Sequence, residues 1–455
     1  MRRETDKLGA RELPAGALYG LQSLRARENF DLGLPPTNDR LILAIVKVKK
    51  AAAMTYLKLV PGMGEVYGAI VWACDHVLAA CPEPGKPGAR PEGWFREAFV
   101  VGAIQGGAGT SANMNVNEVL ANLALGRLGH PPGRYDIVHP LDHVNRGQST
   151  NDVYPTALRI AAIELLRELS QGCADLQEIL QVRENEFTGI KKLGRTELMD
   201  AVPVTLGEEF GAYAQAIARD RWRLYKIEER LRQVNIGGTA VGLSDLAEKR
   251  YRFGVIENLR TLTGLGLAPA EYPMDITQNN DVFVEVSGLL KALAVNLMKI
   301  ANDLRLMNSG PRGGLGEIRL ADLQMGSTIM PGKVNPVIPE MVMGVAIKVM
   351  ANDLAVTMAA AHGEFELNAF SPVIAESLLE SLALLSRAVN VFRERCLATL
   401  RPDAERCARL LSGSLAFAAA YAPRLGYDRV AGIIEESQGD PARALAALKA
   451  AEAGK

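Results

Sequence analysis

The stretch from Asp281 to Asn308, DVFVEVSGLLKALAVNLMKIANDLRLMN, is the part of the chain that decides the fold. Its apolar residues recur at alternating spacings of four and three, which is the pattern of the seam between packed helices. At about 1.5 Å per residue, a helix over this stretch forms a rod of roughly 40 Å. The residues of the seam are Val286, Leu290, Leu293, Leu297, Ile300, Leu304 and Met307.

Four further segments carry helical periodicity, at 156–187, 206–235, 337–362 and 373–398. Each is much longer than the usual helix of about 11–12 residues. A domain of short helices cannot bury such rods. We therefore predict an all-α protein with a long central helix bundle that is shared between subunits. Aromatic residues make up only 5% of the chain, which also favours helices over sheets.

The regions on either side of the rods predict two further domains. In the N-terminal region turn formers interrupt the pattern, most clearly at Cys81–Gly88, where we expect a surface loop. A helix is expected at 41–60, and beyond Arg401 the segments become short. The predicted domains are a mostly helical N-terminal domain at 1–145, the central bundle at 146–398 and a small helical C-terminal domain at 399–455.

The composition excludes several classes of partner. Lys plus Arg total 51 and Asp plus Glu total 52, so nothing in the charge favours a nucleic acid or an anionic membrane. The five cysteines are scattered without a C-x-x-C pair, which argues against a disulfide framework and a structural zinc site. The charged start predicts no secretion signal, and no apolar run approaches the length of a membrane span. We expect a cytoplasmic protein.

Polar, turn-prone clusters fall between the rods, and four of them could carry chemistry. In Gly106–Glu118, glycines let the backbone approach a ligand, while Thr110 and neighbouring hydroxyl and amide groups offer neutral donors. A glycine turn that starts a helix explains the same residues equally well. The segment lacks the GxxxxGK[ST] pattern, so it is not a phosphate-binding P-loop.

The segment His139–Asp152 places two histidines beside the hydroxyl and amide groups of Ser149, Thr150 and Asn151. The histidines have no third ligand at a suitable spacing, so we predict no metal site. Capping of the first long helix is the competing interpretation of the polar residues.

The segment Gly326–Pro336, GSTIMPGKVNP, is the strongest of the four. It combines two hydroxyls, a lysine and an asparagine in a loop flanked by glycine and proline. A lysine beside a serine can bind a carboxylate and favour the deprotonated hydroxyl. The same cation suits a carboxylate whose charge grows during a reaction. The fourth cluster, Gly194–Pro203, indicates little as an isolated string.

Taken together, the four strings resemble the active-site regions of one enzyme group. Gly326–Pro336 is similar to the signature of the aspartase/fumarase superfamily, Gly-Ser-Ser-x-Met-Pro-x-Lys-x-Asn-Pro, with Thr328 at the second serine. The other three strings match that superfamily's remaining active-site regions in the same order. Within it, Gly194–Thr196 and Asn335–Glu340 resemble the aspartate ammonia-lyases more than the fumarases.

This resemblance implies a three-domain, all-α aspartase/fumarase-like fold. It also implies a homotetramer that pools its central bundles into a twenty-helix core, with each active site built from three subunits. The implied reaction acts on a small amino acid: it removes the C3 proton of L-aspartate and expels ammonia from C2. Fumarate forms through an aci-carboxylate intermediate, and no redox or organic cofactor is needed.

The resemblance also assigns roles to individual residues. Ser327 stands at the position of the general base. The remaining residues contact the substrate in three sets: Thr110, Ser149, Thr150 and Thr328 for the charge on the reacting carboxylate, Asn151 with Thr110 and Ser149 for the amino group, and Thr196, Lys333 and Asn335 for the other carboxylate.

Two departures from the family pattern leave the substrate open. Glu197 occupies a position where aspartases carry a His or Gln that donates to the substrate carboxylate, and an ionised Glu there repels it. Either Glu197 turns away or is protonated, or the substrate places a donor or a cation against it. The loop Gly237–Ser244 is also two residues shorter than the family's.

Three alternatives to aspartate deamination therefore remain. One is a carbon–nitrogen lyase that acts on another amino acid or a betaine, as in ergothionase-type relatives. The second is fumarate hydration. The third is a non-catalytic protein like the crystallins of a sister family, against which the retention of Ser327, Lys333 and Asn335 weighs.

Overall fold

The computed structural model describes residues 1–81, 91–243 and 247–454, so most of the loop expected at Cys81–Gly88 lies outside the described residues. Contacts divide the chain into two compact units, each assembled from three segments. Unit 1 consists of Met1–Leu169, Arg223–Lys291 and Lys348–Ser386. Unit 2 consists of Ser170–Trp222, Ala292–Ile347 and Arg387–Lys455.

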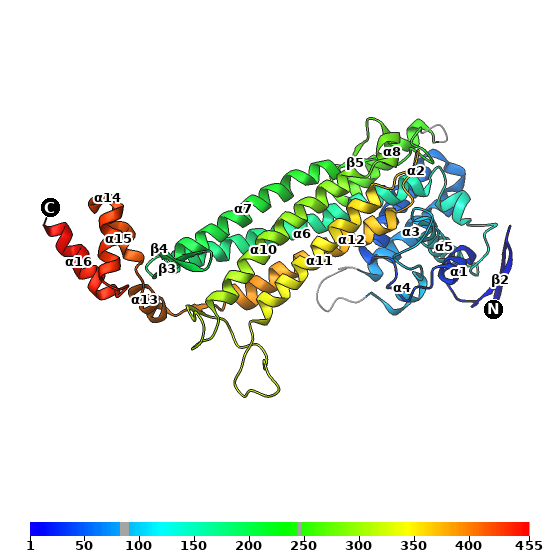
Figure 1. Ribbon diagram of the computed structural model, residues 1–455. Coiled ribbons are helices and arrows are strands. Elements are labelled where there is room, and N and C mark those ends of the chain that lie inside the picture. Colours follow the sequence, from blue (N-terminus) through cyan, green and yellow to red (C-terminus); the bar gives the residue numbers. More distant parts are fainter. Residues whose placement is uncertain (82–90, 244–246, 455) are drawn as a thin grey trace. The chain divides into compact units, whose positions relative to one another are not determined.

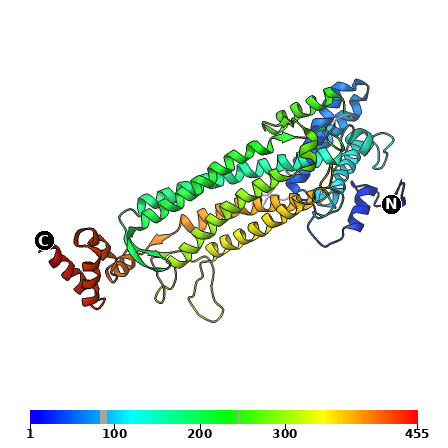
Figure 2. The same cartoon turned by 45° about the horizontal axis from the view of Figure 1, so that its top comes forward.

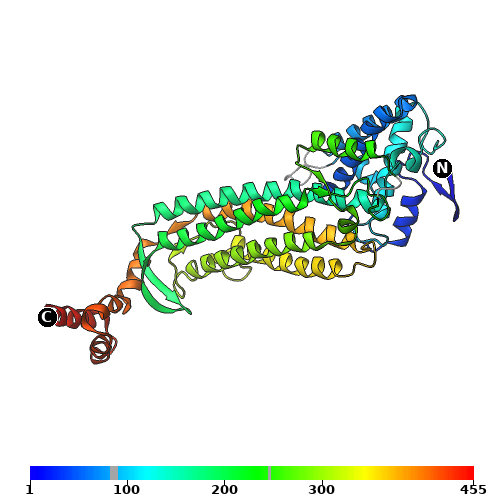
Figure 3. The same ribbon diagram turned by 90° about the horizontal axis from the view of Figure 1, so that it is seen from above.

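Five long helices correspond to the five predicted rods, and their segments lie side by side within unit 1 and again within unit 2. Figure 1, Figure 2 and Figure 3 show this from three directions. The prediction of an all-α protein with a long helix bundle is confirmed. The helices are α6 (Thr150–Glu186), α7 (Leu206–Leu231), α10 (Asp281–Met307), α11 (Val337–Ala360) and α12 (Ser371–Phe392), which a π-helical turn at Arg393–Leu397 extends.

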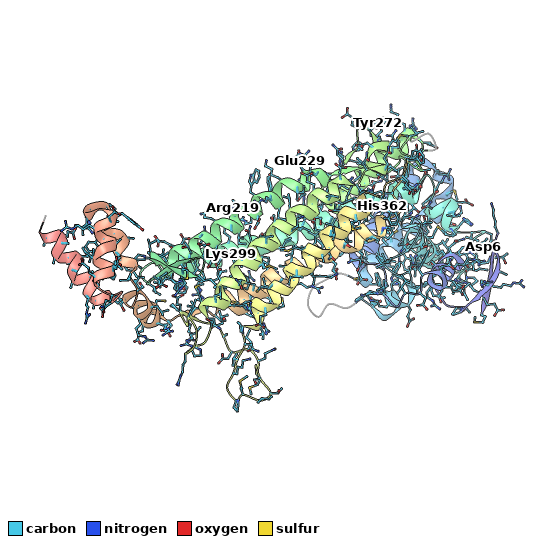
Figure 4. The ribbon with its side chains drawn as sticks, in the orientation of Figure 1. Asp6, Arg219, Glu229, Tyr272, Lys299 and His362 are labelled. Carbon is cyan, nitrogen blue, oxygen red and sulfur yellow. The ribbon has the colours of Figure 1, made fainter. Side chains whose placement is uncertain are left out.

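The seam predicted on α10 is buried over its whole length, since none of its seven residues is more than 4% exposed. Polar side chains add specific links between the helices of unit 2. The Tyr213 hydroxyl of α7 donates a hydrogen bond of 2.8 Å to Asp303 of α10. Lys299, labelled in Figure 4, pairs with the same Asp303, and its ammonium lies 4.9 Å from the centre of the Tyr213 ring.

Helix α11 is apolar enough to need a separate account. By length and composition it could cross a membrane, with a mean hydropathy of 1.5 over a window that is 33% buried. No uninterrupted apolar run in α11 reaches the length of a membrane span, as expected, because Glu340, Lys348 and Asp353 interrupt the helix. Its charged residues nevertheless pair with neighbouring helices of unit 1. Lys348 lies 2.8 Å from Glu380 of α12, and Asp353 lies 2.5 Å from Lys291 of α10, as in the core helix of a bundle.

The rest of unit 1 is a cluster of shorter helices around α2 (Asp39–Leu59), which confirms the helix expected at 41–60. Helix α2 begins where the Asn38 side chain accepts the backbone N–H of Arg40, and it packs against α3 and α8. The other elements of this unit are β1 (Arg2–Asp6), β2 (Gly9–Leu13), α1 (Leu21–Asn29), α3 (Gly64–Ala80), α4 (Gly93–Ala98), α5 (Thr110–Arg127), β5 (Gln233–Val234), α8 (Lys249–Thr263), β6 (Ala268–Pro269) and α9 (Pro273–Gln278).

Unit 2 contains an antiparallel hairpin and a set of short C-terminal helices. Strands β3 (Lys191–Thr196) and β4 (Met199–Thr205) form the hairpin, and α13 (Ala404–Ser412) packs against β3. The short helices after Arg401 agree with the sequence, whereas the boundaries of the three domains stay a prediction. The remaining elements are β7 (Ile318–Arg319), β8 (Arg401–Pro402), α14 (Ala422–Leu425), α15 (Tyr427–Glu436) and α16 (Pro441–Ala453).

Candidate active site

The start of α6 holds three of the predicted substrate-binding residues, and hydrogen bonds fix each of them. The Ser149 hydroxyl accepts the backbone N–H of Asn151 at 3.2 Å, so the oxygen caps the helix while its own proton stays available to a ligand. Thr150 is 8% exposed, and its hydroxyl oxygen accepts from Asn113 Nδ2 at 3.0 Å. Asn151 Nδ2 donates to the carbonyl of Ala240 at 2.7 Å. Capping and substrate binding are therefore compatible here.

A proline in the second turn of α6 explains why the loop before α8 lies against this helix. Pro155 has no N–H, so the carbonyl of Asn151, four residues earlier, lacks its helical partner. Asn235 Nδ2 supplies the missing donor at 3.0 Å and also donates to the Thr277 hydroxyl at 2.8 Å. One amide thus ties the start of α6 to the segments before and after α8.

The side-chain amides of Asn113, Asn117 and Asn145 form a hydrogen-bonded cluster next to Thr150. Asn145 Oδ1 accepts hydrogen bonds from Asn113 Nδ2 at 3.3 Å and from Asn117 Nδ2 at 3.2 Å. It also accepts from the ammonium of Lys49 at 2.7 Å, and that ammonium donates to Gln148 Oε1 at 3.0 Å. Thr150 is therefore connected through Asn113 and Asn145 to a buried cation on α2.

A buried carboxylate also lies at the start of α6. Asp152 is 0% exposed, and Oδ2 accepts the backbone N–H groups of Gly237 and Thr239, both at 3.0 Å, while Oδ1 accepts that of Ser149 at 3.0 Å. Burial raises the pKa of Asp152 to about 7, against these hydrogen bonds and the attraction of Lys49. Burial likewise lowers the pKa of Lys49 to about 7, against the attraction of Asp152.

The glycine-rich segment before α5 makes a tight turn that ends at Thr110. Gly107, Ala108 and Gly109 all have left-handed backbone angles, with φ of 85°, 56° and 90°. A side chain at Gly109 would lie 2.3 Å from the ring of Tyr154, so only glycine fits there. Thr110 is exposed and lies one turn before Asn113 on α5. The structure thus brings Thr110, Ser149, Thr150 and Asn151 into unit 1.

The two histidines of the His139–Asp152 segment accept hydrogen bonds from backbone N–H groups. His139 Nδ1 accepts the N–H groups of Leu141 and Asp142, both at 3.1 Å, and His143 Nδ1 accepts the N–H of His139 at 2.8 Å. Across the described ranges, no group of three or more His, Cys, Asp or Glu side chains is arranged to hold a metal ion. The capping interpretation therefore fits both rings.

Unit 2 carries the loop with the candidate base. The Ser327 hydroxyl oxygen accepts two backbone N–H groups, from Ile329 at 3.2 Å and from Met330 at 2.8 Å. Two donors on one oxygen favour its deprotonated form. The N–H of Gly326 closes the loop by donating to the carbonyl of Lys333 at 2.9 Å. A side chain at Gly326 would collide with the backbone of Lys333 and Asn335.

The other predicted residues of this loop differ in their surroundings. Asn335 Nδ2 donates to the carbonyl of Gly326 at 3.0 Å, so the amide closes the loop and has one further proton for a ligand. Lys333 and Asn335 line a cavity of about 720 Å³, together with Arg305, Arg319 and residues of the segment after α10. Thr328 is exposed.

Thr196 and Glu197 lie at the exposed tip of the β3–β4 hairpin. Glu197 and Leu198 form its two-residue turn with φ of 53° and 66°, angles that ordinarily favour Gly, Asn or Asp. Within the described ranges, neither a salt bridge nor a hydrogen bond engages the Glu197 carboxylate. No hydrogen bond between described residues joins this tip to the Ser327 loop, although both belong to unit 2.

Sequence reasoning missed a buried ion cluster at the base of the hairpin. Glu317 is 0% exposed and accepts from Arg195 at 2.9 and 3.1 Å, and it pairs with Lys192 at 3.0 Å. Lys192 is 2% exposed and also pairs with Glu209 of α7 at 2.8 Å. Lys49 was missed as well. The signal for Lys49 was a lysine on the buried face of α2, whereas Lys192 follows the exposed Lys191 and gave no such signal.

Comparison with known proteins finds similar lyases by sequence and by structure. A lyase family model matches residues 9–351. The aspartate ammonia-lyase of a Bacillus species is 42% identical, over 96% of this chain and 91% of the relative, and that of Pseudomonas aeruginosa is 44% identical, over 94% and 88%.

Solved structures show the same similarity. The cobalt-bound crystal structure called fumarate lyase:delta crystallin, from Brucella melitensis, has a TM-score of 0.91 at 43% identity and covers 99% of this chain and 98% of that one. A class II fumarase from Schistosoma mansoni has a TM-score of 0.91 at 30% identity, with coverages of 98% and 95%.

Proposed function

The chain belongs to the lyase family of the aspartase/fumarase superfamily, and we propose that it is an ammonia-lyase that converts L-aspartate reversibly to fumarate and ammonia. The names of relatives that are 42% and 44% identical over nearly the whole chain support this substrate. The observation that carries the chemistry is the Ser327 hydroxyl, whose oxygen accepts two backbone N–H groups.

In the proposed mechanism, the ionised Ser327 oxygen takes the proton from C3 of the substrate. The electron pair of that C–H bond delocalises into the adjacent carboxylate, which becomes a doubly charged aci-carboxylate. Collapse of this intermediate forms the C2–C3 double bond and breaks the C2–N bond, so that ammonia leaves with the electron pair. The Ser327 proton is then returned to solvent.

The substrate-binding residues supply donors where charge develops. The hydroxyls of Thr110, Ser149, Thr150 and Thr328 meet the aci-carboxylate, because donors fixed in advance stabilise a growing charge best. Asn151, with Thr110 and Ser149, holds the amino group. Lys333, Asn335 and Thr196 bind the second carboxylate. No step calls on a cofactor or a metal.

We further propose a homotetramer in which three subunits contribute to each active site. The support is the exposed apolar stripe on α11, where Ile347, Leu354 and Met358 recur at spacings of seven and four and are 61%, 61% and 57% exposed. Light scattering is expected to give four times the chain mass of 49.0 kDa. A stable monomer at micromolar concentration would contradict the proposal.

Glu197 favours one second candidate, a carbon–nitrogen lyase whose amino acid substrate carries a cation or a ring donor. Its carboxylate has no partner among the described residues and lies next to Thr196, which the proposal places on the substrate. A substrate with a cation at that end would supply the missing partner.

We place the protein in the cytoplasm. All five cysteines are free and buried, as in a chain that functions where thiols stay reduced.

A substrate panel tests the function. The purified protein is incubated with L-aspartate, L-malate and a set of amino acids that includes cationic and imidazole-bearing ones, and the ultraviolet absorbance of an unsaturated acid is followed. Aspartate is expected to give the highest kcat/KM. A stronger signal from a cationic amino acid would shift the assignment to the second candidate, and silence across the panel would favour a non-catalytic protein.

A further inference from the structure

Two buried charges beneath the start of α6 have no role in the proposed chemistry. Lys49, on α2, and Asp152, on α6, are both 0% exposed. A charge in a protein interior is costly unless other groups compensate for it, so their partners are informative. The partners of Lys49 lead to Thr150, whereas those of Asp152 lead to Asn151 and to the backbone of Ser149.

Lys49 is connected to the residue that faces the reacting carboxylate. Its ammonium donates to Asn145 Oδ1 at 2.7 Å, which Asn113 Nδ2 also approaches at 3.3 Å. The same Asn113 nitrogen donates to the Thr150 hydroxyl at 3.0 Å. Because the hydroxyl oxygen is occupied as an acceptor, its proton is left to point towards a ligand.

Asp152 is connected to the residue that faces the amino group. Its Oδ2 gathers the N–H groups of Gly237 and Thr239, which have left-handed φ of 86° and 57°. This turn presents the carbonyl of Ala240 to Asn151 Nδ2 at 2.7 Å. A carboxylate that binds two N–H groups of one turn fixes the position of that turn.

We infer that Lys49 and Asp152 are positioning residues that divide the substrate between them: Lys49 orients the donor to the reacting carboxylate through Asn145, Asn113 and Thr150, and Asp152 orients the holder of the amino group through the 237–240 turn and Asn151. The inference rests on the proposed function.

Lys49→Met tests the first branch. Thr150 serves the charge that develops in the transition state, so kcat for L-aspartate is expected to fall about ten- to a hundredfold, the range for loss of a charged hydrogen bond, while KM stays within about threefold. The methionine removes the hydrogen bonds that Lys49 donates to Asn145 and Gln148. Asn113→Ala breaks the same path without removing a charge. It is expected to lower kcat in the same way and to leave KM nearly unchanged.

Asp152→Asn tests the second branch with a change of one atom. KM for L-aspartate is expected to rise about tenfold, because Asn151 loses its fixed orientation. Succinate has the two carboxylates but no amino group, so its binding does not depend on the orientation of Asn151. Its inhibition constant is therefore expected to change by less than about twofold. Equal weakening of aspartate and succinate would overturn the division of roles.

Matched controls separate positioning from general destabilisation. Lys50 follows Lys49 on α2 and pairs with Asp75 at the surface. Lys50→Met and Asp75→Asn therefore remove the same charges without touching either path, and their kinetic constants are expected to stay at wild-type values. A loss of kcat in Lys50→Met as large as in Lys49→Met would overturn the inference, as would wild-type kinetics in Lys49→Met and Asn113→Ala.

Failure of the proposed function is distinguishable from failure of this inference. A wild-type protein that forms no fumarate from L-aspartate disproves the function directly. If the wild type is active, and the variants either show a lower kcat together with a higher KM or show no change in either constant, only the positioning roles are disproved.

Discussion

The two regions that carry the candidate site residues differ in how firmly they are held. At the start of α6 in unit 1, Thr150 and Asn151 have fixed partners, and a buried lysine and a buried aspartate lie behind them. In unit 2, the Ser327 loop is closed by the two contacts of Gly326, and Ile329 at its tip is 87% exposed. The proposed binding groups of unit 1 are preformed, whereas the proposed base is carried on an exposed loop, as in enzymes that enclose the substrate before reaction.

A different comparison holds inside unit 2. The exposed tip of the hairpin carries Thr196 and Glu197, but its base is fixed by the cluster of Glu317, Lys192 and Arg195. Buried charges therefore lie behind residues that we propose to face the substrate, in both units. This arrangement predicts that substitutions of the buried charges lower stability or activity strongly. Substitutions at exposed positions are expected to have smaller effects.

Glu317→Gln is expected to have the largest effect on stability. It removes the fully buried counter-charge of Arg195 and leaves Lys192 with the partly buried Glu209 alone, which costs about 3–5 kcal/mol of unfolding free energy. Denaturant unfolding at one fixed protein concentration measures it. Glu405→Gln, at a side chain that is 90% exposed, is the control and is expected to change the free energy by less than about 1 kcal/mol. Similar losses in both variants would show that the cluster is not a structural support.

Ser327→Ala is expected to lower kcat by on the order of 10²-fold or more while the fold and the oligomer stay intact, because a positioned base is lost. Steady-state kinetics with L-aspartate measures the effect. Met325→Ala, two residues earlier and 77% exposed, is the matched control in the same loop. Near wild-type turnover in Ser327→Ala would remove this residue from the role of base.

Glu197→Gln sharpens the choice of substrate. With L-aspartate a repulsion is replaced by a donor, so KM is expected to fall. With a substrate that carries a cation at that end, kcat/KM is expected to fall about ten- to a hundredfold. Asp200→Asn on the same hairpin is the control. Identical kinetic constants for the variant and the wild type on every substrate would place Glu197 outside the site.

The cysteines are expected to show the smallest effect. Burial raises the pKa of Cys173 and Cys396 to about 12 and that of Cys407 to about 11, so the reactive thiolate is scarce up to a pH of about 9. Iodoacetamide at a pH of about 8 is then expected to leave the native protein unmodified by mass spectrometry. All five thiols should react after denaturation, and fast modification of the native chain would contradict their burial.

The long helices could be predicted from the sequence because their signal is local. The seam from Val286 to Met307 repeats every three or four residues, and burial follows that repeat. The Ser327 loop could be identified because its glycine, serine, lysine and asparagine lie within eleven residues.

The supporting groups could not be predicted in the same way, since their partners are distant in the chain. Lys49 meets Asn145 across 96 positions, and Arg195 meets Glu317 across 122. Only the folded chain brings such residues together. The turn at Glu197 was also hidden, because neither Glu197 nor Leu198 is a residue type that signals a left-handed backbone.

Joint quantification of both products tests the central claim most directly. The purified wild-type protein is incubated with L-aspartate, and fumarate and ammonia are measured in the same samples over time. Deamination predicts that the two rise in equal amounts and that added fumarate and ammonia regenerate L-aspartate. Absence of either product, while another substrate of the panel is consumed, would contradict the claim.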